Sequence, residues 1–92
     1  MEKLKNFRQL ERLVRGFANH RRIQIVELLD REPELLVIEI AGRLNINFKT
    51  AAEHVRRLAL AGIVMKRSDG ASVRHKLTRM GSYILKFLRT LE

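Results

Sequence analysis

The sequence predicts a mainly α-helical fold with one small β-hairpin. In five stretches the apolar residues recur every three or four positions, which is the spacing of an amphipathic helix. After the fourth stretch come two basic runs with strand-like alternation around the turn dipeptide Asp69-Gly70. Two helices at a short turn followed by a hairpin predict a winged helix-turn-helix with five helices and a two- to three-stranded antiparallel wing.

The first two helices are predicted over residues 3–18 and 20–31. Asn19 suits the N-cap position of the second helix, and Pro33 ends it because a proline disfavours helical geometry at the preceding residue. Leu35 and Leu36 are expected to form a short strand that pairs with the hairpin. The apolar stripe of the first helix comprises Leu4, Phe7, Leu10, Val14 and Phe17.

The third and fourth helices, predicted over residues 37–44 and 48–61, flank the break Asn45-Ile46-Asn47. Asn47 is expected to cap the fourth helix, because its side chain can accept a hydrogen bond from the Thr50 backbone N–H. Gly62 suits the C′ position that ends this helix. The third helix lacks an obvious polar N-cap, so its start is less well defined.

The wing and a last helix complete the predicted domain. Strands are expected over Ile63–Arg67 and Ser72–Leu77. Thr78 can start the last helix, predicted over residues 79–91. Its apolar stripe comprises Met80, Tyr83, Ile84, Phe87, Leu88 and Leu91.

The composition indicates one small globular domain over residues 1–92, with no cofactor expected. Hydrophobic residues make up 46% of the chain. No apolar run approaches the roughly 18 residues needed to cross a bilayer, and the N-terminus lacks the apolar stretch of a signal peptide, so we expect a cytoplasmic protein without membrane contact. The absence of cysteine excludes disulfides and thiolate metal sites, and the three histidines are not spaced as metal ligands. An enzyme is not expected, because the sequence has no phosphate-binding Gly-rich loop, nucleophile elbow or HExxH motif.

The formal net charge of +9 is unevenly distributed. Residues 1–42 hold 8 Lys/Arg against 7 Asp/Glu, whereas residues 43–89 hold 11 against 2. The surplus therefore lies in the part of the chain that contains the fourth helix and the wing. Clustered positive charge attracts phosphate polymers through counterion release, which favours a nucleic-acid partner over a solvated basic surface without one.

Several short segments, in the same order, resemble the ArsR/MarR-type winged-helix regulators. Residues 17–29 resemble the second-helix signature of that family, and Ala61-Gly62-Ile63-Val64 resembles the "AGLV" start of its wing. Residues 68–78 resemble the rest of the wing. Residues 47–58 resemble its recognition helix, with matching positions at Thr50, His54, Val55, Arg56 and Leu58.

One segment departs from the pattern of the metal-sensing members. Residues 34–40 match the register of the "ELCVCDL" box, but Leu36 and Ile38 stand at its two thiol positions. A thiolate binds soft metals and a hydrocarbon does not, so metal sensing through this box is excluded. The resemblance therefore leaves the effector open.

Side chains of the fourth helix and of the wing are expected to contact duplex DNA. Lys49, near the helix start, suits a base edge or a phosphate, and Ala52 suits a thymine methyl group. Arginine at the small wing tip favours a narrow minor groove, although a charged edge strand also deters aggregation. The predicted DNA-binding set is Asn47, Phe48, Lys49, Thr50, Ala52, Glu53, Arg56, Arg57, Lys66, Arg67 and Arg74.

Two of these positions have competing interpretations. Glu53 suits acceptance from cytosine, but pairing with Arg56 or Arg57 three or four residues later is favoured. Phe48 is in phase with the apolar positions of the helix, so at least partial packing into the core is favoured over contact with a base or sugar.

The apolar stripes of the two terminal helices exceed what a compact winged helix needs for its own core. They therefore predict a homodimer, which the family resemblance also implies, with recognition helices reading half-sites about 34–36 Å apart. Covering the chain's own core is the alternative. The predicted dimerisation residues are Leu4, Phe7, Leu10, Val14, Tyr83, Ile84, Phe87, Leu88 and Leu91.

The sequence therefore predicts a sequence-specific double-stranded DNA-binding transcriptional regulator, with helix 48–61 in the major groove and wing 66–74 at the minor groove. The alternative is a winged-helix protein-interaction module of transcription or replication machinery, in which Phe48 and Ala52 contact an unknown protein partner.

Overall fold

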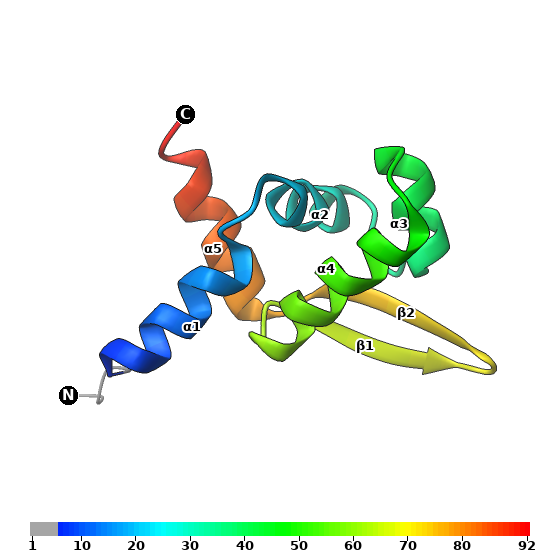
Figure 1. The fold of residues 1–92 in the computed structure, drawn as a ribbon, viewed down its shortest axis with the longest axis horizontal. Helices are drawn as coiled ribbons and strands as arrows, with labels where there is room; N and C mark the ends of the chain where they lie inside the picture. The colour runs from blue at the N-terminus through cyan, green and yellow to red at the C-terminus, as the bar shows by residue number, and fades with distance from the viewer. Residues whose placement is uncertain (1–5) are drawn as a thin grey trace.

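The computed structural model describes residues 6–92, which form five helices and a two-stranded hairpin (Figure 1). α1 and α5 lie at one end of the molecule, and α3 and the hairpin tip lie at the other (Figure 1). This arrangement confirms the predicted fold class. The elements are α1 Phe7–Phe17, α2 His20–Arg31, α3 Val37–Leu44, α4 Phe48–Leu60, β1 Val64–Asp69, β2 Ser72–Leu77 and α5 Arg79–Arg89.

α1 begins later than the sequence predicted. The backbone of Asn6 is extended, and its side chain accepts the Gln9 N–H at 2.8 Å. The Gln9 side chain accepts the Asn6 N–H at 3.0 Å, which completes a capping box. α1 therefore begins at Phe7 and ends at Phe17, and Asn6 and Ala18, which were predicted to be helical, are its cap residues. The predicted helical positions 3–5, including Leu4, lie outside the described residues.

α3 starts at Val37, as predicted, without a polar N-cap residue. Instead the Glu39 carboxylate accepts the Leu36 N–H at 2.8 Å. Asn45 ends the helix in the left-handed region, with φ of 54°, and turns the chain towards α4.

Both ends of α4 have the predicted caps. The Asn47 side chain accepts the N–H groups of Lys49 at 2.7 Å and Thr50 at 3.3 Å. At the other end Gly62, with φ of 78°, donates to the Ala59 carbonyl at 3.1 Å. The helix ends at Leu60, one residue before the predicted limit.

The wing is an antiparallel hairpin in which Lys66 pairs with His75 and Arg67 with Arg74. β1 runs from Val64 to Asp69, which corrects the predicted range 63–67. Ile63 is left out of the strand pairing, and its carbonyl instead accepts the Thr78 N–H at 3.0 Å. The short strand predicted at Leu35 and Leu36 is a single bridge between Leu35 and His75.

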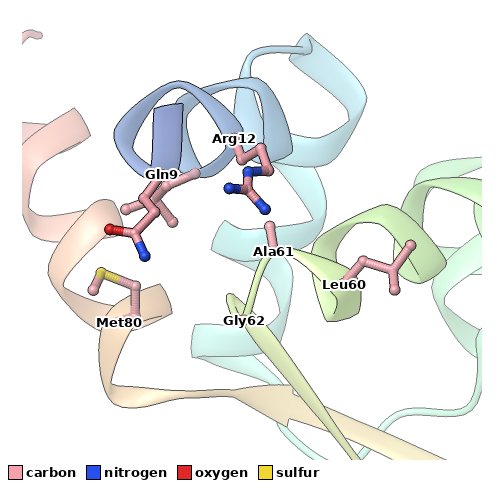
Figure 2. Close-up of a pocket in the computed structure, with 7 residues that line it drawn as sticks. Gln9, Arg12, Leu60, Ala61, Gly62 and Met80 are labelled. Atoms are coloured by element: carbon pink, nitrogen blue, oxygen red, sulfur yellow. The ribbon is translucent and has the colours of Figure 1, made fainter. Parts of the chain in front are cut away.

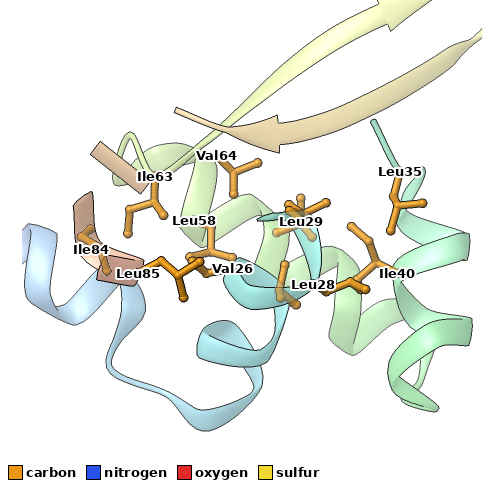
Figure 3. Close-up of a cluster of buried hydrophobic side chains, with 12 residues drawn as sticks. Val26, Leu28, Leu29, Leu35, Ile40, Leu58, Ile63, Val64, Ile84 and Leu85 are labelled. Carbon is orange, nitrogen blue, oxygen red and sulfur yellow. The ribbon is translucent and has the colours of Figure 1, made fainter. Parts of the chain in front are cut away.

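The core lies between α2 and α4, and the remaining elements contribute side chains from its edges (Figure 3). Burying each such aliphatic side chain stabilises the fold by roughly 1.5–3 kcal/mol. The buried cluster comprises Ile25, Val26, Leu28, Leu29, Leu35, Ile40, Val55, Leu58, Ile63, Val64, Ile84 and Leu85.

α5 approaches the start of β1 closely, and Gly81 makes this approach possible. A Cβ at this position would clash with the Ile63 carbonyl oxygen. Thr78 caps α5 by accepting the Gly81 N–H at 3.0 Å, while its hydroxyl donates to the Gly62 carbonyl at 2.6 Å. α5 is therefore attached to the body of the domain by its first turn.

Candidate nucleic-acid interface

α4 packs on the core by one face and leaves the opposite face exposed. Ala51, Val55 and Leu58 are buried, whereas Lys49 and Arg56 are exposed. With 3.6 residues per turn these two sets lie on opposite sides of the helix. The outer face of α4 is therefore free to enter a groove of a partner.

Glu53 is bonded to both arginines of the same helix. Its carboxylate accepts from Arg56 at 2.9 and 2.7 Å and from Arg57 at 2.9 Å. The hydrogen bond from Arg56, followed by that from Arg57 and by both positive charges, lowers the pKa of Glu53 to about 2. Pairing, the favoured interpretation of Glu53, is therefore confirmed. The carboxylate holds both guanidinium groups beside the outer face of α4 and neutralises part of their charge.

Phe48 lies at the edge of a groove between α4 and the wing. Its side chain is 50% exposed, so it is only half-buried. The groove has a volume of about 400 Å³, and its lining includes Phe48, Ala52 and Val73. Arg56 and Lys66 also line this groove, so an apolar floor is combined with basic side chains.

The hairpin separates the three predicted wing cations. Lys66 is opposite the buried His75, whereas Arg67 is opposite Arg74. Since successive side chains of a strand point to opposite faces, Lys66 faces the groove beside α4, and Arg67 and Arg74 face the other way. The sequence did not predict this division of the wing.

Both wing arginines have carboxylate partners. Arg67 is 2.8 Å from Glu34, and Arg74 is 2.7 Å from Asp69. Arg74 also donates to the Glu34 carbonyl at 3.0 Å. The hydrogen bond and charge of Arg74 lower the pKa of Asp69, so this pair is ionised at neutral pH. A DNA phosphate would have to replace these carboxylates.

The predicted dimerisation residues fall into two groups. Ile84 is 6% exposed and belongs to the core, and Leu88 packs against the core. Both side chains therefore contribute to the core of their own chain. Leu4 lies outside the described residues. The side chains that remain exposed are Phe7, Leu10, Val14, Tyr83, Phe87 and Leu91.

The structure also brings together four arginines that the sequence analysis did not connect. Arg12 and Arg15 of α1, Arg22 of α2 and Arg57 of α4 line one pocket of about 220 Å³. We call this the arginine pocket. No spacing in the sequence indicates it, because its residues come from three different helices.

Two of the three histidines are at least partly buried, and His20 is exposed. His75 is buried, and its Nδ1 lies 3.0 Å from the Leu35 carbonyl oxygen. His54 is partly buried, and desolvation, followed by the charge of Arg22, lowers its pKa. Within residues 6–92 no cluster of three histidine or acidic side chains could hold a metal ion, and no helix could span a membrane.

Residues 19–65 match the family described as winged helix-turn-helix DNA-binding. This range contains α2, α3, α4 and the start of β1. No curated protein matches the chain in sequence.

Solved structures share this fold. The homodimeric winged helix-turn-helix DNA-binding domain of a possible ArsR-family regulator from Mycobacterium bovis has a TM-score of 0.83 at 24% identity, over 99% of this chain and 89% of that one. HlyU from Vibrio cholerae has a TM-score of 0.78 at 28% identity, over 97% of each chain. FabT from Streptococcus pneumoniae, solved in complex with DNA, has a TM-score of 0.69 at 18% identity, over 77% of this chain and 52% of that one.

Proposed function

The chain belongs to the winged helix-turn-helix DNA-binding family, and from that premise we propose that it regulates transcription as a homodimer that places α4 in the major groove of duplex DNA. Double-stranded DNA is then its ligand and the cytoplasm its place of action. The proposal involves no catalytic step and no cofactor.

The uncovered outer face of α4 carries this proposal. Lys49 and Arg56 are exposed seven residues apart, which is about two turns, so both can reach the same groove. Lys49 and Thr50 lie beside the N-cap, where the positive end of the helix dipole favours a phosphate. Ala52 offers a methyl group at the edge of the same face. Arg57 lies at the flank of that face and is assigned to phosphate.

The wing is assigned to the neighbouring backbone and minor groove. Lys66 faces the same groove as Arg56, so these two side chains can contact one DNA strand together. Arg67 and Arg74 would exchange Glu34 and Asp69 for phosphate when the hairpin approaches the duplex. Such an exchange costs little free energy, because surface ion pairs contribute only about 0–1 kcal/mol to stability.

The terminal helices are assigned to dimerisation. Phe7 of α1 is 89% exposed, and Leu91, just beyond α5, is 65% exposed. α1 and α5 lie at the end of the molecule away from the hairpin tip (Figure 1). Exposed apolar side chains gathered on one face mark association sites, and a second copy would cover these. The structurally similar Mycobacterium bovis domain is itself homodimeric. Dimerisation through α1 and α5 would leave α4 of each copy free for DNA.

Selection of bound duplexes from a random pool tests the proposal. We expect an inverted repeat with half-sites about one helical turn apart, bound with strong salt dependence. Lys49→Gln and Arg56→Gln should weaken binding, whereas Arg31→Gln, at the far end of α2, removes the same charge and should not. Failure to retain any duplex at low salt would refute the proposal.

A protein partner is the second candidate function, and the apolar groove beside Phe48 favours it. A protein would contact Phe48 and Ala52, whereas DNA affinity depends on Lys49 and Arg56. Phe48→Ala that abolishes capture of a protein but leaves duplex affinity intact would favour the second function. If Lys49→Gln loses duplex affinity and Phe48→Ala leaves protein capture unchanged, DNA binding is favoured.

A further inference from the structure

The arginine pocket lies where three helices meet, away from the apolar groove beside the wing. Arg12 and Arg15 come from α1, Arg22 from the first turn of α2 and Arg57 from the second half of α4. Figure 2 shows a neighbouring pocket that shares Arg12, Leu60 and Ala61 with the arginine pocket; there the Arg12 side chain extends from α1 towards Ala61. Arg57 is eight residues beyond Lys49, so the pocket lies about 12 Å along α4 from its N-terminal end.

Acidic side chains neutralise only part of the charge of this pocket. Glu11 lies 2.9 Å from Arg15, and Glu53 lies 2.9 Å from Arg57. Glu53 is shared with Arg56 outside the pocket. Among residues 6–92, no carboxylate lies within 4.0 Å of the Arg12 or Arg22 guanidinium. Four arginines therefore line the pocket, and only one full and one shared carboxylate pair with them.

Arg22 is held in place by the backbone rather than by an acid. Its Nη1 donates to the carbonyls of Arg15 at 3.0 Å and Gly16 at 3.2 Å. Its Nε is buried and has no hydrogen-bond partner among the described residues. Desolvation, followed by the charge of Arg57, lowers the pKa of Arg22. An anion in the pocket would relieve this repulsion between like charges.

We propose that the arginine pocket binds one phosphate group. Guanidinium groups match the geometry of phosphate oxygens and keep their charge at every physiological pH. At about 220 Å³ the pocket is smaller than a typical organic-ligand site of roughly 300–1,000 Å³, so the phosphate group itself is the recognised unit.

The phosphate comes either from the DNA backbone beside the end of α4 or from a free phosphorylated molecule. Both sources present the same chemistry to the pocket. The first source rests on the proposed function, whereas the second does not. Arg12→Gln distinguishes these two sources of phosphate, because the proposed function assigns no DNA contact to Arg12.

The first arm of the test uses inorganic phosphate and the full chain without DNA. Nuclear magnetic resonance of the arginine Nε–H groups follows a phosphate titration at constant ionic strength, with sodium chloride as the reference. We expect saturable shifts at Arg12, Arg22 and Arg57. Arg12→Gln and Arg57→Gln should each weaken the phosphate affinity by about tenfold, the loss of one charge-assisted hydrogen bond.

Arg31→Gln is the matched control for Arg57→Gln. Each arginine bonds a glutamate four residues earlier at 2.9 Å, and the side chains of both arginines are 54% exposed. The control therefore removes the same charge and the same kind of ion pair outside the pocket, and it should leave the phosphate titration unchanged. Thermal unfolding of each variant verifies that the fold is retained.

The second arm uses a duplex selected by the unaltered protein. If the DNA backbone supplies the phosphate, Arg12→Gln should weaken duplex binding and lower the slope of its salt dependence by about 1. One neutral methylphosphonate linkage in the duplex should then remove the difference between Arg12→Gln and the unaltered protein. If a free molecule supplies it, the phosphate titration saturates and duplex affinity is the same in both proteins.

The proposal is overturned if phosphate acts on the arginine signals only as chloride does and Arg12→Gln binds the duplex normally. The proposal is also overturned if phosphate acts only as chloride does and the loss of duplex affinity in Arg12→Gln persists with every methylphosphonate duplex. In the first case duplex binding itself persists, so the proposed function survives the failure of this inference.

Discussion

Replacing Gly81 by Ala tests how α5 is docked on the domain. A Cβ at Gly81 would clash with the carbonyl oxygen of Ile63, a fully buried residue. The same carbonyl accepts the Thr78 N–H at 3.0 Å, so it cannot rotate away without losing a hydrogen bond. Because the obstructing atom belongs to the backbone, α5 must move away from the start of β1.

The change in the free energy of unfolding caused by Gly81→Ala is the sum of two opposed contributions. Alanine in place of glycine in a helix stabilises by about 0.5–1 kcal/mol. An added carbon in a packed site costs typically about 1–3 kcal/mol. We therefore expect Gly81→Ala to lower the free energy of unfolding by about 1 kcal/mol net, and by at most about 2.5 kcal/mol. For a domain of this length each kcal/mol corresponds to a fall of about 4–8 °C in the melting temperature.

Gly42→Ala is the control, since this residue also lies in a helix but a Cβ there has no atom within 4 Å. Only the helix-propensity contribution remains, so we expect a gain of about 0.5–1 kcal/mol. Urea and thermal unfolding of both variants measure whether each substitution raises or lowers the free energy of unfolding. Equal stability of Gly81→Ala and Gly42→Ala would refute the close docking of α5.

Three further results are expected. Glu53→Gln should tighten duplex binding and steepen its salt dependence, because Arg56 and Arg57 are freed for phosphate. Fluorescence anisotropy measures both. If the variant instead loses its preference for cytosine-containing sites, Glu53 reads a base. The Glu53 pKa of about 2 lies below its ordinary value of 4.5, so its ion pairs stabilise the fold above pH 4.5 and this contribution is lost as the pH falls towards 2. The urea midpoint of the unaltered protein should therefore fall more over this range than that of Glu53→Gln, and parallel curves would contradict the assignment. Phe87→Glu should yield a monomer in sedimentation equilibrium, whereas a persistent dimer would exclude this part of α5 from the interface.

The amino-acid sequence by itself determined the features that depend on near neighbours. The Asn47 cap, the Gly62 end of α4 and the Asp69-Gly70 turn were all predictable, because each involves groups within a few residues. The pairing of Glu53 with Arg56 and Arg57 follows from helical spacing in the same way. The start of α1 was missed because the Asn6 capping box competes with an apolar pattern that continues before it.

Tertiary structure alone decided which distant side chains meet. Arg67 and Arg74 both bond Glu34, which lies 33 and 40 positions away along the chain. The arginine pocket combines three helices, and Gly81 is required only because Ile63 packs against it. Such contacts depend on how the helices pack around a shared core, so local periodicity and capping carry no information about them.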